Sequence, residues 1–266
     1  MLQTALRRDP QNTSLKGDLI RVEAQIGGLD AGLAMARSLA KTDPNSGVYD
    51  ITSAELYEKA GRAKDALGLL EEAAANRPAD DDLAIALSRL YTATDVPAKA
   101  EAVLKARLEA DPPNARVRSA LASNYLGQKK YADAIAEYTR LIESRPGDSS
   151  ALNNLAWLYQ HRGELAEARQ LAQRAFAVSP RDPHIDDTLG WILLEQGEAA
   201  QATTYLSAAN LSAPRDPNIQ YHLAAALYRA GRSADAEALL KTLLGSGASF
   251  ADKAAAEKLL QEMKPG

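Results

Sequence analysis

The sequence contains no cysteine, few aromatic residues and no long apolar run. Without cysteine the chain can form neither disulfide bonds nor thiolate metal sites, and it lacks a cysteine nucleophile. No apolar segment approaches the roughly 18–20 residues that a membrane-spanning helix needs. The first ten residues lack the apolar core and cleavage site of a signal peptide. The formal net charge of −4 provides no basic surface of the kind that binds nucleic acid.

What the sequence does contain favours helices. Apolar residues make up 46% of the chain although only 5% is aromatic, and alanine is abundant. Alanine is the best helix former, and its small side chain lets helix axes approach each other. Acidic and basic residues alternate along the chain, which is typical of solvated helix faces.

Prolines recur at a fixed step of 34 residues. The series is Pro10, Pro44, Pro78, Pro112, Pro146, Pro180 and Pro214. One set of small residues has the same step: Ala66, Ala100, Ala134, Ala168, Ala202 and Ala236. A second set comprises Ala54, Ser88, Ala122, Ala156, Gly190 and Ala224. Tyrosines recur in the same way at Tyr57, Tyr91, Tyr125 and Tyr159. Such an internal period indicates a repeat architecture.

Each residue type in this pattern has a physical role. Proline ends a helix because it lacks the backbone donor and disfavours helix just before it. Asp148, Asp182 and Asp216 follow their prolines by two residues and are expected to cap the next helix. Small residues at two fixed positions allow two helices of one repeat to pack closely. The sequence therefore predicts pairs of short helices, with turns at Gly27-Gly28, Gly61, Asp95, Lys129-Lys130, Gly163, Gly197 and Gly231.

Leucines also recur at this step, at Leu87, Leu121, Leu155, Leu189 and Leu223. The combined spacing of Leu, Gly or Ala, Tyr, Ala and Pro resembles the tetratricopeptide repeat family over nearly the whole chain. The resemblance implies an all-α fold, a right-handed superhelix (α-solenoid) of helix–turn–helix repeats with a C-terminal capping helix. We expect the end of a truncated repeat at 1–12, seven repeats over 13–250 and the capping helix at 251–266. The repeats are expected at 13–46, 47–80, 81–114, 115–148, 149–182, 183–216 and 217–250. Because 1–12 fits the end of a second helix, we expect the chain to be the C-terminal part of a longer protein.

In this family, repeat positions 2, 5, 6, 9, 12 and 13 of the first helix point into a concave groove. In the repeats at 81–148 those positions hold mostly small residues. From 149 onward they hold aromatic and polar residues. The predicted groove residues are Asn153, Asn154, Trp157, Gln160, His161, His184, Asp187, Thr188, Trp191, Glu195, Tyr221, His222, Tyr228 and Arg229. Rings interleaved with amides and carboxylates suit an extended peptide or a sugar chain. Alternatively, Trp157 and Trp191 pack partly against the neighbouring helix, and both interpretations can hold together.

Catalytic chemistry is not expected. The three histidines lie at different groove positions without the paired spacing of a zinc site. A serine nucleophile would have no nucleophile elbow behind it, and the glycines fall at turns rather than in a phosphate-binding loop. We therefore expect a non-enzymatic protein without cofactor or metal, which binds protein or peptide partners and no nucleic acid.

The segments 151–180, 187–198 and 221–244 also resemble the end of the tetratricopeptide-repeat lipoproteins of PEP-CTERM/exosortase exopolysaccharide systems. This resemblance implies a periplasmic scaffold in exopolysaccharide production or surface-protein sorting, with membrane attachment only through a lipid anchor upstream of this fragment. Its groove would bind proteins or the polysaccharide itself. Two alternatives stay open: a cytoplasmic adaptor for an unrelated complex, and the regulatory arm of an enzyme.

Overall fold

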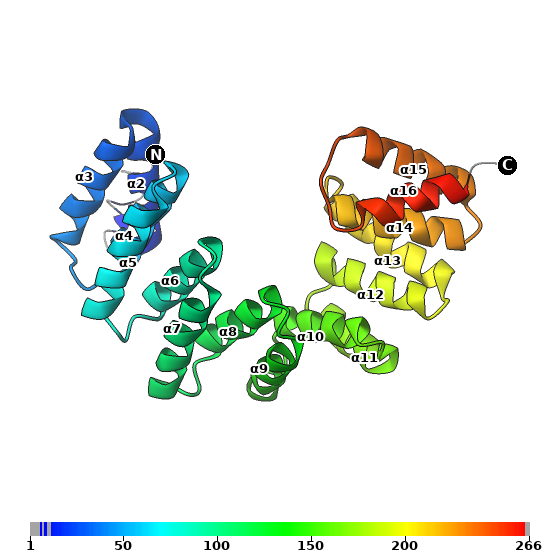
Figure 1. Cartoon of the computed structure of the whole chain (residues 1–266), viewed down its shortest axis with the longest axis horizontal. Coiled ribbons are helices and arrows are strands. Elements are labelled where there is room, and N and C mark those ends of the chain that lie inside the picture. Colours follow the sequence, from blue (N-terminus) through cyan, green and yellow to red (C-terminus); the bar gives the residue numbers. More distant parts are fainter. Residues whose placement is uncertain (1–5, 7, 10–11, 264–266) are drawn as a thin grey trace. The chain divides into compact units, whose positions relative to one another are not determined.

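The computed structural model describes residues 6, 8, 9 and 12–263, and this part of the chain forms 15 α-helices and no strand (Figure 1). In chain order the helices are α2 (Thr13–Gly27), α3 (Leu29–Ala40), α4 (Val48–Lys59), α5 (Ala63–Asn76), α6 (Asp81–Ala93), α7 (Pro97–Ala110), α8 (Ala115–Gly127), α9 (Tyr131–Ser144), α10 (Ser149–His161), α11 (Leu165–Val178), α12 (Pro183–Glu195), α13 (Ala199–Ser212), α14 (Pro217–Arg229), α15 (Ser233–Gly245) and α16 (Lys253–Glu262). The predicted all-α solenoid of helical repeats is confirmed.

Each predicted 34-residue window from 13–46 to 217–250 contains one helix pair. We call the even-numbered first helix of a pair helix A and the second helix B. The phase at which one repeat ends and the next begins is a choice of convention, so the repeat boundaries stay a prediction. The predicted repeat end at 1–12 lies mostly outside the described residues.

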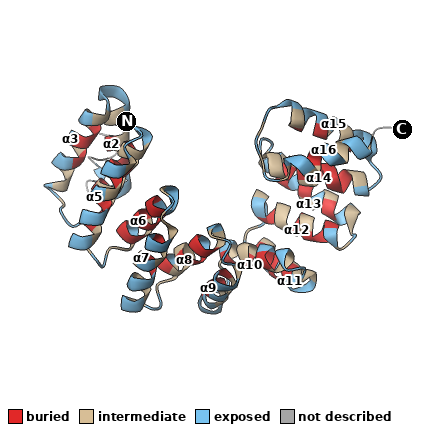
Figure 2. Cartoon of the chain, in the orientation of Figure 1, coloured by how far each residue is buried: buried red, intermediate tan, exposed pale blue. Residues whose placement is uncertain are grey.

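The helices form two compact units, one up to Glu137 and one from Tyr138 onward. We call them the N-terminal and C-terminal units. Within each unit, buried residues line the sides on which neighbouring helices meet, and exposed residues cover the outer faces (Figure 2). None of the helices in the described part combines the length and apolar character that crossing a bilayer requires.

The predicted helix starts are confirmed. Side chains of Asp148, Asp182 and Asp216 accept hydrogen bonds from backbone N–H groups in the first turns of α10, α12 and α14. Pro183 and Pro217 occupy the first turn of their helices, where a missing N–H costs nothing. These caps fix where each helix A begins and hence which face it presents.

Small residues lie where the helices of a pair meet, as predicted. Ala66, Ala100, Ala134, Ala168, Ala202 and Ala236 all have zero exposed surface. The turns also form where expected, with left-handed backbone at Gly28, Gly61, Asp95, Lys129, Gly163, Gly197 and Gly231. The helix pair is thus specified locally by its turn and its small contact residues.

Helix α16 covers the last helix pair. Its Ala256 is fully buried, and Ala255, Leu259 and Met263 pack against the core that contains Tyr221, Leu240 and Leu243. These residues form one apolar stripe of the terminal helix that the sequence predicts. Helix α16 begins at Lys253, two residues later than predicted, and Ala251 and Asp252 lie in the turn before it.

Candidate partner-binding groove

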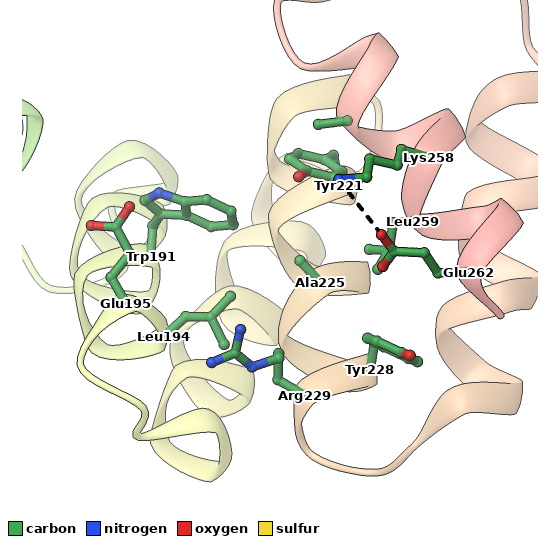
Figure 3. Close-up of a pocket in the computed structure, with 11 residues that line it drawn as sticks. Trp191, Leu194, Glu195, Tyr221, Ala225, Tyr228, Arg229, Lys258, Leu259 and Glu262 are labelled. Atoms are coloured by element: carbon green, nitrogen blue, oxygen red, sulfur yellow. Dashed lines mark ion pairs between the residues drawn. The ribbon is translucent and has the colours of Figure 1, made fainter.

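Two pockets of the C-terminal unit meet at one tryptophan. The first, which we call the terminal pocket, has a volume of about 460 Å³ and lies between α12, α14 and α16 (Figure 3). It is lined by Trp191, Leu194, Glu195, Tyr221, Ala225, Tyr228, Arg229, Ala255, Lys258, Leu259 and Glu262. The second, which we call the polar pocket, has a volume of about 480 Å³ and is lined by Trp157, Gln160, His161, Asp187, Thr188, Trp191, Asn218, His222, Ala251 and Asp252. Because Trp191 lines both, the pockets adjoin, and we call them together the aromatic groove.

Helix geometry explains why these residues share the groove. Residues three or four positions apart lie on one helix face. Helix α10 contributes Trp157, Gln160 and His161 at such spacing. Helices α12 and α14 contribute the equivalent faces, since each helix A repeats the orientation of the one before it.

Trp191 is both a packing residue and a groove residue. Its ring stacks on His222, with centroids 4.1 Å apart and an interplanar angle of 30°, and lies 5.9 Å from the Tyr221 ring. These contacts are with the next helix A, and the indole is half-buried. The packing interpretation of Trp191 is confirmed, and its part in ligand binding stays a prediction. Trp157 is 38% exposed and stacks in parallel on His161 of its own helix at 5.2 Å.

His222 joins three helices through two carboxylates. Its Nδ1 lies 2.8 Å from an oxygen of Asp187 on α12, and its Nε2 lies 3.8 Å from Asp252 at the start of α16. Burial lowers the pKa of His222, but hydrogen bonds and charges from the two aspartates outweigh burial and raise the pKa to about 9. The hydrogen bond from His222 lowers the pKa of Asp252. The imidazole is thus a cation at neutral pH.

Eleven of the predicted site residues line the aromatic groove. Gln160 Nε2 donates to both carboxylate oxygens of Glu195 at 2.9 Å, which links α10 to α12. The other three predicted residues line neither pocket. Asn153 is half-buried, Asn154 donates to the Tyr138 hydroxyl at 2.9 Å, and His184 is exposed at the start of α12. Their part in binding stays a prediction.

The sequence interpretation missed the contribution of α16 to the groove. Helix α16 was expected only to cover an apolar face, yet Asp252, Ala255, Leu259 and Glu262 line the pockets. The signal was present, because these residues fall at positions 2, 5, 9 and 12 of a further 34-residue window that begins at 251. Helix α16 takes the place of one more helix A.

The N-terminal unit also pairs its polar groups across helices. Polar residues of successive helices A pair with each other: Arg21 with Glu55, Arg89 with Glu58, Arg116 with Asp82, and Asn124 with Thr92. A pocket of about 560 Å³ in this unit includes Asp80, Asp82 and Arg89, and no aromatic residue is among its described lining. A smaller pocket of about 150 Å³ in the same unit is lined by Tyr49 and Tyr57, whereas both tryptophans of the chain lie in the C-terminal unit.

Comparisons with known proteins agree with the repeat pattern. Two family models, both described as tetratricopeptide repeat, match this chain, one at residues 57–123 and 193–263 and the other at residues 119–183. No curated protein sequence matches it significantly. Within the described residues, no group of three or more histidines or carboxylates is placed to hold a metal ion.

Solved structures share the fold at low sequence identity. The crystal structure of the APC/C hetero-tetramer Cut9-Hcn1 matches 98% of this chain, with a TM-score of 0.69 and 17% identity. The match covers 51% of that chain, so this chain spans about half its length. Pseudomonas aeruginosa pilF matches over 88% of this chain and 100% of its own, with a TM-score of 0.66 and 19% identity. A tetratricopeptide repeat protein from Parabacteroides merdae matches over 85% of this chain and 90% of its own, with a TM-score of 0.59 and 21% identity.

Proposed function

Because this chain belongs to the tetratricopeptide repeat family, whose members generally act as protein-interaction scaffolds, we propose that it binds an extended segment of a protein partner in the aromatic groove. One observation carries the proposal: two pockets meet at a half-buried indole that lines both. Large aromatic residues in such settings dominate the binding energy of protein interfaces.

The groove combines the features that an extended peptide requires. The terminal pocket has mainly apolar walls that can accept a side chain, and the polar pocket offers amide, imidazole and carboxylate groups. Binding pockets are typically apolar with a few polar groups that fix orientation. A peptide lying along successive helices A would contact Trp157 and Trp191, which project from α10 and α12.

The partners of His222 support a structural role for its side chain. A general base must be neutral near the working pH, whereas the pKa of His222 is raised to about 9. Both ring nitrogens also face carboxylates, those of Asp187 and Asp252. The imidazole therefore acts as a structural cation that joins α12, α14 and α16.

The test uses a library of random twelve-residue peptides displayed on phage and selected against the full chain. We expect groove-binding peptides whose affinity falls at least tenfold in Trp191→Ala, since truncating an aromatic anchor costs on the order of 2 kcal/mol or more. Leu211→Ala is the matched control, because Leu211 is an exposed apolar residue (82%) on helix B α13. Peptides that bind the wild type and both variants equally would contradict the groove as the site. Enrichment of no peptide, together with binding of a polysaccharide, would favour a glycan ligand instead.

A finer proposal depends on the resemblance of residues 151–180, 187–198 and 221–244 to exopolysaccharide-system lipoproteins. We propose that the scaffold serves exopolysaccharide production or surface-protein sorting from a periplasmic, membrane-anchored position. A signal peptide with a lipid-attachment cysteine at the start of the full gene is the expected observation. Its absence, with a cytoplasmic complex recovered by the chain, would favour the alternative of a cytoplasmic adaptor.

A further inference from the structure

The terminal pocket contains one charged side chain without a partner. Glu195 accepts hydrogen bonds from Gln160, and Glu262 lies 3.8 Å from Lys258. Arg229 at the end of α14 forms no hydrogen bond or ion pair with any other residue that the structure describes. Figure 3 shows its guanidinium reaching toward Leu194 of α12, at the edge of the apolar walls. Among the described lining residues, Arg229 is thus the charged side chain that has neither a hydrogen bond nor an ion pair.

We infer that the terminal pocket takes one large apolar side chain of the partner peptide and that Arg229 binds a carboxylate of the same peptide. This inference rests on the proposed function, which it deepens by naming the chemistry of the partner. A guanidinium can hold a carboxylate through two parallel hydrogen bonds, and such a pair is stronger than a neutral hydrogen bond.

The walls of the terminal pocket support the binding of a large apolar side chain. Trp191 and Leu194 of α12 lie on one side of the pocket (Figure 3). Tyr221 and Ala225 of α14, together with Leu259 of α16, lie on the other side. The volume of about 460 Å³ falls within the roughly 300–1,000 Å³ of small-ligand pockets. An aliphatic or aromatic side chain placed there is removed from water, which is favourable.

The charges of the pocket limit the partner peptide to a single carboxylate near its apolar side chain. Two cations, Arg229 and Lys258, and two anions, Glu195 and Glu262, line it, so its formal charge is zero. A run of acidic residues in the partner would bring further carboxylates close to Glu195 and Glu262. We therefore expect one acidic residue near the apolar one, and not an acidic stretch.

The experiment uses an array of nine-residue Gly/Ser peptides, each with a Leu or Phe at its centre and a single Asp. The Asp is placed in turn at each of the four positions on either side of the centre. Each Asp peptide has a matched Asn peptide, and affinities of the best pairs for the full chain are measured by calorimetry. We expect the Asp peptide to bind about tenfold more tightly at the favoured spacing. Arg229→Gln should abolish this preference, so that the Asp and Asn peptides bind equally, and Leu259→Ala should weaken both peptides.

Arg232→Gln is the matched control, because Arg232 is an exposed arginine just beyond α14 that is already paired with Asp235. Equal binding of Asp and Asn peptides, or a preference that survives in Arg229→Gln, overturns the inference. If array peptides fail while display-selected peptides still depend on Trp191, this inference fails and the proposed function stands. If neither set binds, both fail; binding of oligogalacturonate alone likewise overturns both, because the carboxylate would then belong to a glycan.

Discussion

Gly190 of α12 and Leu206 of α13 lie in such close contact that a Cβ atom added to Gly190 would sit 2.6 Å from the Leu206 Cγ. The same Cβ would lie 3.3 Å from the carbonyl oxygen of Ala202. Leu206 is fully buried. Glycine at this repeat position therefore sets the distance between the two helices of the pair.

Replacing Gly190 with alanine should destabilise the protein by about 1–3 kcal/mol, because the added methyl overpacks the contact. Chemical unfolding followed by circular dichroism measures the effect. Gly68→Ala is the matched control, since Gly68 is exposed in α5 with nothing near its missing Cβ, and it should stabilise by about 0.5–1 kcal/mol. Equal stability of Gly190→Ala and the wild type would contradict the close helix approach.

Lys129 stands at a turn in which most repeats have glycine, and its φ of 58° is left-handed. This conformation strains a residue with a Cβ, so Lys129→Gly should raise the free energy of unfolding by about 0.5–1 kcal/mol. Gly163 has a φ of 78° at the equivalent turn, and Gly163→Ala should have the opposite sign. Thermal melting of the two variants provides the measurement, and a stabilising Gly163→Ala would refute the explanation.

The C-terminal unit should lose stability as the solution becomes alkaline. Folding raises the pKa of His222 from 6.5 to about 9, so its contribution is fully present below pH 6.5 and is lost as pH rises through about 9. The pKa difference corresponds to an upper bound on the order of 3 kcal/mol. Both tryptophans of the chain lie in this unit, so their fluorescence during urea unfolding at pH 6 to 9.5 reports its stability.

In His222→Gln this pH dependence should largely disappear, whereas the exposed His184→Gln should retain it. Unfolding midpoints of the C-terminal unit that do not change between pH 6 and 9.5 in the wild type would show that the imidazole is not held by Asp187 and Asp252.

Deleting α16 should cause the chain to self-associate. The deletion uncovers the core that contains the buried residues Tyr221, Leu240 and Leu243, and it removes Leu259 from the terminal pocket. Light scattering should detect oligomers, since uncovered terminal repeats of solenoids are poorly soluble. Lys258→Ala, which removes one exposed side chain of α16, serves as the control and should stay monodisperse. A monodisperse deletion variant would contradict the covering role of α16.

The sequence period predicted the fold well because each of its signals acts locally. Caps such as Asp182 and turns such as Gly163 depend on a few neighbouring residues, and a small residue such as Ala168 contacts a helix of its own repeat. These features can therefore be predicted without information on the rest of the chain.

The partners of groove residues could not be predicted in the same way. The period assigns Arg89 and Arg229 to the groove, yet Arg89 is bound to Glu58 while Arg229 has no partner among the described residues. That difference depends on side-chain orientation and on pairs about one repeat apart, which positions alone do not specify. The contribution of Leu259 was missed for another reason: helix α16 was treated as a cover and not as one more helix A.

One indole, that of Trp191, lines both pockets of the aromatic groove. A rotation of the Trp191 ring that widens the space beside Leu259 also changes its stacking on His222, and thereby the position of a side chain that Asp187 holds. If the proposed function holds, we expect the two halves of the groove to be coupled through this ring. For a partner that fills both halves, the binding free energy would then differ from the sum of the binding free energies of its two separate segments.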